Sequence, residues 1–101
     1  MDNYNQFRTS TGQIISGEAL QQACNQLAVW YDNQAVLVRQ EDCFDSHVTQ
    51  AAKDDYIKRY YTDTAQAVRE RSNLANFTIW QKLNTILTGE CVAFLPAGEA
   101  Q

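Results

Sequence analysis

The chain has 101 residues, of which 45% are apolar and 20% are charged, and its formal net charge is −4. This length and composition are typical of one globular domain with a modest core, and they exclude a disordered chain or one that needs metal or disulfide support. The acidic balance disfavours a nucleic-acid partner, because phosphate neutralisation requires clustered Lys and Arg. No apolar run approaches the roughly 18–20 residues that span a membrane.

The start of the chain and its thiols predict a cytoplasmic protein without a cofactor. Met1-Asp2-Asn3-Tyr4 is acidic and polar, unlike the basic start of a signal peptide. The three cysteines, Cys24, Cys43 and Cys91, are odd in number and show no C-x-x-C spacing. We therefore expect reduced thiols rather than a disulfide framework.

The first 31 residues predict a short N-terminal segment followed by a helix. Residues 1–15 form either a short hairpin with Gly12 at the turn or an ordered arm without regular structure. A helix is expected over about 17–31, with Ser16 as its cap and Asp32-Asn33 as its end. Val29 lies on the polar side of this helix. The apolar stripe of this helix comprises Leu20, Ala23, Cys24, Leu27, Trp30 and Tyr31.

Residues 35–39 are too few to classify by periodicity, but their β-branched content favours a strand or extended connector. A second such segment is expected at 91–95, where it would pair with the first. Between the first of these segments and the central stretch, a polar loop is expected at 41–46. Residues 96–101 are expected to form a loose tail.

The central stretch 46–71 lacks Gly and Pro and predicts a long helix with two opposed faces. One side carries Ile57, Tyr60, Tyr61, Thr64 and Val68. The other carries Asp55, Arg59, Asp63, Gln66 and Glu70, whose alternating charges at four-residue spacing are typical of a solvated helix face. Val48, Ala51 and Ala52 fall on this charged side. The helix therefore bends, starts late, or packs its first turn against a different surface, and Thr62-Asp63-Thr64 is a second weak point.

A third helix is expected over about 74–88, after the break at Ser72-Asn73 and before the stop at Gly89. Its apolar stripe comprises Ile79, Trp80, Leu83, Ile86 and Leu87. The fold class is thus mainly α, a single three-helix domain over 1–101 with minor β or extended segments. A small α+β domain is the alternative.

Cys43 and His47 are the residues most suggestive of reactive chemistry. They stand four apart, which would place them on one helical turn as two metal ligands or as a nucleophile and its base. Zinc needs two more ligands, and Cys24 and Cys91 belong to no paired motif. A small metal-binding or thiol-dependent enzyme centred on Cys43 and His47 is therefore the alternative function, not the leading one.

Residues 56–61 mix basic and aromatic side chains, as single-strand nucleic-acid binders do. Asp54, Asp55 and Asp63 surround them and would repel phosphate, so a helical nucleic-acid-binding domain is a second alternative. The chain has no phosphate-binding or hydrolase signature.

The leading hypothesis is a small, non-enzymatic regulatory protein that acts through protein–protein contacts. Large aromatics are frequent for three short helices, and Tyr and Trp are enriched at interface hot spots. We expect either a homodimer or a surface that docks on a larger partner, with no membrane association. The competing interpretation is that these rings all fill the core. The predicted interaction surface comprises Val29, Trp30, Tyr31, Tyr56, Tyr60 and Tyr61.

Overall fold

The computed structural model describes residues 3–89 and confirms a mainly α-helical fold with a small antiparallel sheet. In chain order the elements are β1 (Gln6–Arg8), β2 (Ile14–Ser16), α1 (Gly17–Glu41), α2 (Gln50–Ile57), the π-helical turn η1 (Lys58–Thr62), α3 (Asp63–Arg69) and α4 (Phe77–Thr88).

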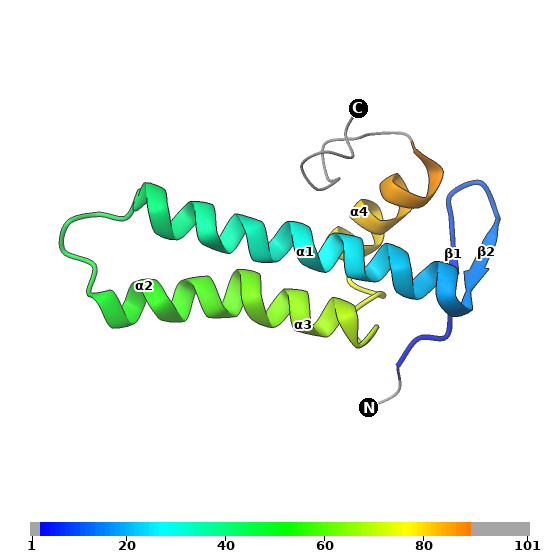
Figure 1. Ribbon diagram of the computed structural model, residues 1–101, viewed down its shortest axis with the longest axis horizontal. Helices are drawn as coiled ribbons and strands as arrows, with labels where there is room; N and C mark the ends of the chain where they lie inside the picture. Colours follow the sequence, from blue (N-terminus) through cyan, green and yellow to red (C-terminus); the bar gives the residue numbers. More distant parts are fainter. Residues whose placement is uncertain (1–2, 90–101) are drawn as a thin grey trace.

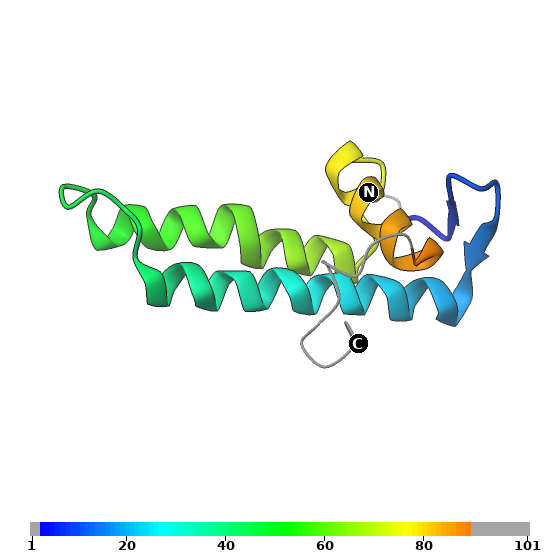
Figure 2. The same cartoon turned by 90° about the horizontal axis from the view of Figure 1, so that it is seen from above.

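The molecule is built on a long helical hairpin. Helix α1 runs antiparallel to the continuous α2–η1–α3 segment, and the β-strands and α4 gather at one end of this pair (Figure 1). The view turned by 90° shows the same arrangement, with α4 and the strands at one end and the loop that joins α1 to α2 at the other (Figure 2). The principal extents of 47 × 37 × 19 Å describe this elongated shape. We call the two ends the strand end and the loop end.

The N-terminal residues form a β-hairpin that is tied to α4. Gly12 supplies the positive φ of 89° that the turn requires. Phe7 is buried and stacks on Trp80 at 6.1 Å between ring centroids, and the Trp80 indole N–H donates to the Arg8 carbonyl at 3.2 Å. At the turn, Asn84 accepts from the Ser10 backbone N–H at 2.8 Å. Together these contacts hold the sheet against α4.

The core lies at the strand end, where α1, α3, α4 and the hairpin converge. Small side chains at Ala28 and Ala65 are fully buried, which lets α1 and α3 pack closely. The Arg69 guanidinium reaches the Asp32 carboxylate at 2.5 Å along the same contact. The buried cluster comprises Phe7, Leu20, Ala23, Cys24, Leu27, Ala28, Tyr31, Ala65, Val68, Leu74, Ile79 and Leu83.

The first helix is longer than expected, and the strand predicted at 35–39 is wrong. Asp32-Asn33 does not end the helix, because Asp32 pairs with Arg69 and Ala35 is buried, so packing against the second arm of the hairpin favours continued helix. The end comes at Asp42, which adopts a left-handed φ of 46° and donates its backbone N–H to the Val38 carbonyl at 3.0 Å. The expected partner segment 91–95 and the tail 96–101 lie outside the described residues.

The central helix starts late, at Gln50 rather than residue 46. Thr49 caps it by accepting the Ala52 backbone N–H at 3.1 Å. Likewise the third helix begins at Phe77 rather than 74, because Asn76 caps it by accepting the N–H groups of Thr78 and Ile79.

The turn η1 explains how the α2–η1–α3 segment keeps its apolar residues facing α1. In a regular α-helix Ile57 and Ala65, eight residues apart, would differ by roughly 80° around the axis; the extra residue of a π turn reduces this to about 20°. Both are in fact buried.

The ion pairs of this segment follow the same geometry. Asp55 pairs with Arg59 at 3.2 Å as expected, but Asp63 pairs with Lys58, five residues back, at 3.0 Å, so the expected Arg59–Asp63 pair is wrong.

Candidate functional site

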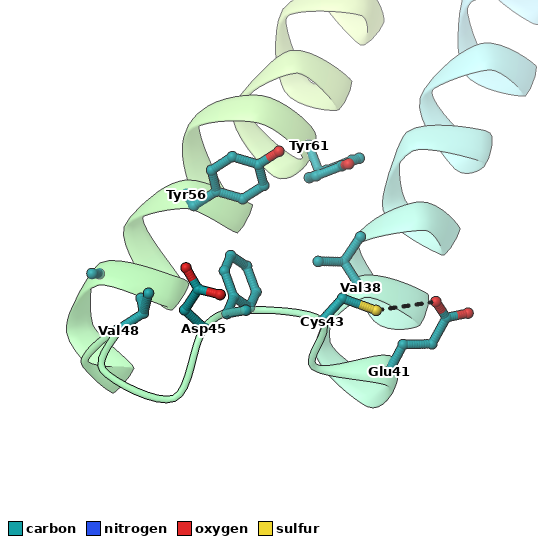
Figure 3. Close-up of a pocket in the computed structure, with 9 residues that line it drawn as sticks. Val38, Glu41, Cys43, Asp45, Val48, Tyr56 and Tyr61 are labelled. Carbon is teal, nitrogen blue, oxygen red and sulfur yellow. Dashed lines mark hydrogen bonds between the residues drawn. The ribbon is translucent and has the colours of Figure 1, made fainter.

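A groove lies at the loop end of the helical hairpin, between the C-terminal turns of α1, the 42–49 loop and the α2–η1 segment. Its volume is about 630 Å³. Figure 3 shows side chains from both arms and from the loop surrounding it. We call it the distal groove. Its lining comprises Val38, Glu41, Cys43, Phe44, Asp45, Val48, Ala52, Tyr56 and Tyr61.

The distal groove continues the buried face of α1 beyond the point that α4 covers. Cys24, Tyr31 and Val38 are seven residues apart and therefore follow one line along α1. Cys24 and Tyr31 belong to the buried cluster, whereas Val38 is half-buried and lines the groove. Tyr61 belongs to both regions, since it packs against the cluster and lines the groove. This line of α1 thus changes from buried to half-buried between Tyr31 and Val38.

Aromatic rings form one wall of the distal groove. Tyr56 contacts Phe44 edge-on at 5.4 Å, Tyr60 at 4.8 Å and Tyr61 at 6.2 Å between ring centroids. In Figure 3 Tyr56 extends from α2 toward Tyr61. Burial and the neighbouring Tyr56 raise the pKa of the Tyr61 phenol. The ring therefore stays neutral at physiological pH and offers an apolar face with one hydroxyl.

The six residues predicted as an interaction surface do not form one exposed surface, although Trp30 contacts Tyr31 edge-on at 5.0 Å between ring centroids. Tyr31 is only 7% exposed and belongs to the core, where burial raises the pKa of its phenol. Trp30 is half-buried beneath the Lys82 ammonium, 5.7 Å from its ring centroid. Val29 is exposed on the side of α1 away from Tyr31, since two residues correspond to roughly 200° around a helix.

The three tyrosines of the central segment are the predicted residues that lie at the distal groove. Tyr56 and Tyr61 line it, and the exposed Tyr60 packs on Tyr56 at its edge. Sequence reasoning missed Val38, because it was assigned to a strand, and Phe44, because it lies in a polar loop. A large aromatic within an otherwise polar loop was the signal that could have identified Phe44.

Charges around the distal groove are unevenly paired. Away from the lining, Asp42 pairs with Lys53, Asp54 with Arg39, Asp55 with Arg59 and Asp63 with Lys58. Within the described part of the chain the two lining carboxylates, Glu41 and Asp45, enter no ion pair. The groove therefore combines apolar walls with two carboxylates that have no ion-pair partner among residues 3–89, while the Lys53 ammonium lies 5.9 Å from the Phe44 ring centroid.

The arrangement of Cys43 and His47 differs from the one that their spacing suggested. Both lie in the loop before α2, so they do not share a helical turn. The Cys43 thiol faces the Glu41 carboxylate, with Sγ 4.0 Å from Oε2. Residues 3–89 contain no group of three or more His, Cys, Asp or Glu side chains placed to hold a metal ion. Cys24 is buried in the core, and Cys91 lies outside the described residues.

The basic residues near the tyrosines are already neutralised. Lys58 and Arg59 pair with Asp63 and Asp55, so they do not form an open basic surface for phosphates. Among the helices of the described chain, none combines the length and apolar character needed to cross a membrane.

Comparison with protein-family models, with curated proteins and with solved structures finds no match.

Proposed function

We propose that this protein is a small, non-enzymatic interaction module of regulatory type, and that the distal groove is where it docks on a partner protein. The observation that supports this most strongly is the open apolar groove at the loop end, continuous with the line of Cys24 and Tyr31 that is buried toward the strand end. The free thiols Cys24 and Cys43 fit a reducing, cytoplasmic environment.

The distal groove has the features of a helix-binding site. Two antiparallel helices leave a furrow between them, and burying an amphipathic helix in such a furrow is a common mode of peptide recognition. Tyr56 is 42% exposed although it contacts three other rings, so a partner would bury pre-ordered aromatic surface at little entropic cost.

Site-specific photo-crosslinking in the source cells tests this proposal. A photoreactive phenylalanine analogue would replace Tyr56 in one variant and Phe77 in a control. Phe77 is 70% exposed on α4, outside the groove. We expect a discrete covalent adduct from position 56 and none from position 77. Identical adduct patterns, or no adduct from position 56, would contradict docking in the groove.

Self-association is a second candidate, supported by a different surface. Val29 and Val36 are 39% and 50% exposed and stand seven residues apart, so they form one apolar line on the outer side of α1. Two copies could bury these lines against each other. Light scattering coupled to size-exclusion chromatography should then show a dimer that Val36→Asp dissociates. A monomer at high micromolar concentration would remove this candidate.

A further inference from the structure

Two acidic side chains mark the loop end of the distal groove. Figure 3 shows Glu41 at the end of α1 beside Cys43 and Asp45 in the loop on the side of Val48, and both line the groove. Glu41 has the Cys43 thiol as its neighbour, which supplies no positive charge. By contrast, the acidic residues just outside the lining, such as Asp42 and Asp54, each have a cation within 4.0 Å.

From this pattern we infer that the partner seated in the distal groove is an amphipathic α-helix of about three turns, whose apolar stripe is accompanied by Lys or Arg at the end over the loop. The inference rests on the proposed docking function and deepens it by naming the chemistry of the partner. The apolar stripe meets Val38, Tyr56 and Tyr61, and the basic residues meet Glu41 and Asp45.

The fold already contains one helix packed against α1 at the strand end. Helix α4 contacts α1 there, and its Ile79 and Leu83, four residues apart, are both buried in the cluster. The groove-lining residue Val38 continues the line of Cys24 and Tyr31 that belongs to the same buried cluster. A second helix beyond the end of α4 would extend this packing along the hairpin.

The charges favour a basic helix over a second copy of this chain. A copy carries a net charge of −4 and would add negative charge near Glu41 and Asp45. Carboxylates that enter an interface without a cation lose hydration without compensation, whereas Lys or Arg restores it.

Two synthetic peptides of about 15 residues provide the probe. Both carry the same leucine stripe at helical spacing; one has Lys at the remaining polar positions and the other has Glu. Binding of each labelled peptide to the full chain is measured by fluorescence anisotropy at about 0.1 M salt. At this ionic strength the electrostatic screening length is roughly 10 Å, so charges in contact still interact. We expect the Lys peptide to bind about tenfold tighter than the Glu peptide.

The decisive variant is Glu41→Lys with Asp45→Lys, and its control is Glu18→Lys with Glu70→Lys. Both change the net charge from −4 to 0, because each replaces two acidic residues by two basic ones. Glu18 and Glu70 are exposed and lie outside the distal groove. We expect the preference for the Lys peptide to disappear or reverse in the first variant and to persist in the control. Circular dichroism verifies that both remain helical.

Other outcomes overturn the inference in distinguishable ways. Equal binding of both peptides by the wild type, abolished by Tyr56→Ser with Tyr61→Ser, would overturn the basic partner but leave docking in the groove intact. A Lys preference that survives in Glu41→Lys with Asp45→Lys would place the contact elsewhere. Failure of both peptides to bind, or formation of a dimer that excludes them, would also overturn the inference of a basic helical partner. The crosslinking from position 56 would then decide separately whether the groove docks a protein.

Discussion

Ile57 is the side chain on which the loop end of the hairpin depends most. It is only 1% exposed, yet it lies outside the main buried cluster at the strand end, as Ala35 does. Replacing it by Ala removes buried methyl and methylene groups and leaves a cavity, which typically destabilises a protein by 2–5 kcal/mol. Because few other apolar residues are buried at this end, we expect Ile57→Ala to act through local opening of the loop end rather than through the whole fold.

Hydrogen exchange followed by mass spectrometry measures this directly. A cost of about 3 kcal/mol corresponds to a local opening that is more than 100-fold more frequent. Amides in residues 50–62 and 36–45 should therefore exchange at least ~100-fold faster in Ile57→Ala. Amides near Leu27, in the core at the strand end, should change by less than about fivefold.

Leu37→Ala serves as the control, because Leu37 lies on the same part of α1 but is exposed. Surface substitutions of this kind usually change the free energy of unfolding by less than about 0.5 kcal/mol. An equal acceleration near Leu27 and at the loop end would refute the idea that the loop end opens on its own. If no amide in residues 50–62 or 36–45 exchanged more than about threefold faster, the burial of Ile57 would be refuted.

Three further predictions concern the core, a helix cap and the docking of the hairpin. In a Cys91→Ser background at pH 8, a thiol reagent should modify exposed Cys43 rapidly and buried Cys24 only after unfolding. Burial raises the pKa of the Cys24 thiol to about 11, and the Arg71 guanidinium partly offsets this effect. Since the fold favours the neutral thiol, the free energy of unfolding should be insensitive to Cys24 ionisation below about pH 8 and should fall as pH rises from there toward 11; urea titrations of Cys24→Ala should lack that part of the fall. Asn76→Ala removes the cap that accepts two backbone N–H groups of α4 and should lower the free energy of unfolding by about 1 kcal/mol, whereas Asn76→Asp should retain most of it. Asn84→Ala breaks both hydrogen bonds to Ser10 and should cost about 1–2 kcal/mol with faster amide exchange in residues 6–16; an unchanged exchange rate there would contradict the docking of the hairpin on α4.

The sequence by itself determined the features that depend on local periodicity and local backbone preferences. The stripe of Leu20, Cys24 and Leu27 predicted the buried face of α1, because helical spacing places these side chains on one side whatever they pack against. Gly12 indicated the turn of the N-terminal hairpin, since a positive φ favours glycine. The placement of Tyr56, Tyr60 and Tyr61 on the central helical segment followed in the same way.

Only the tertiary structure decided the features that depend on which surfaces meet. Residues 35–39 are helical because Asp32 and Ala35 pack against the opposite arm, a contact that no local pattern reveals. The turn η1 forms where the arm must keep Ile57 and Ala65 on one side. The distal groove lies at the end of the hairpin opposite α4, and there Val38 is half-buried although it continues the line of Cys24 and Tyr31. Local sequence sets which face of a helix is apolar, but the length and position of the neighbouring helix set how much of that face remains open.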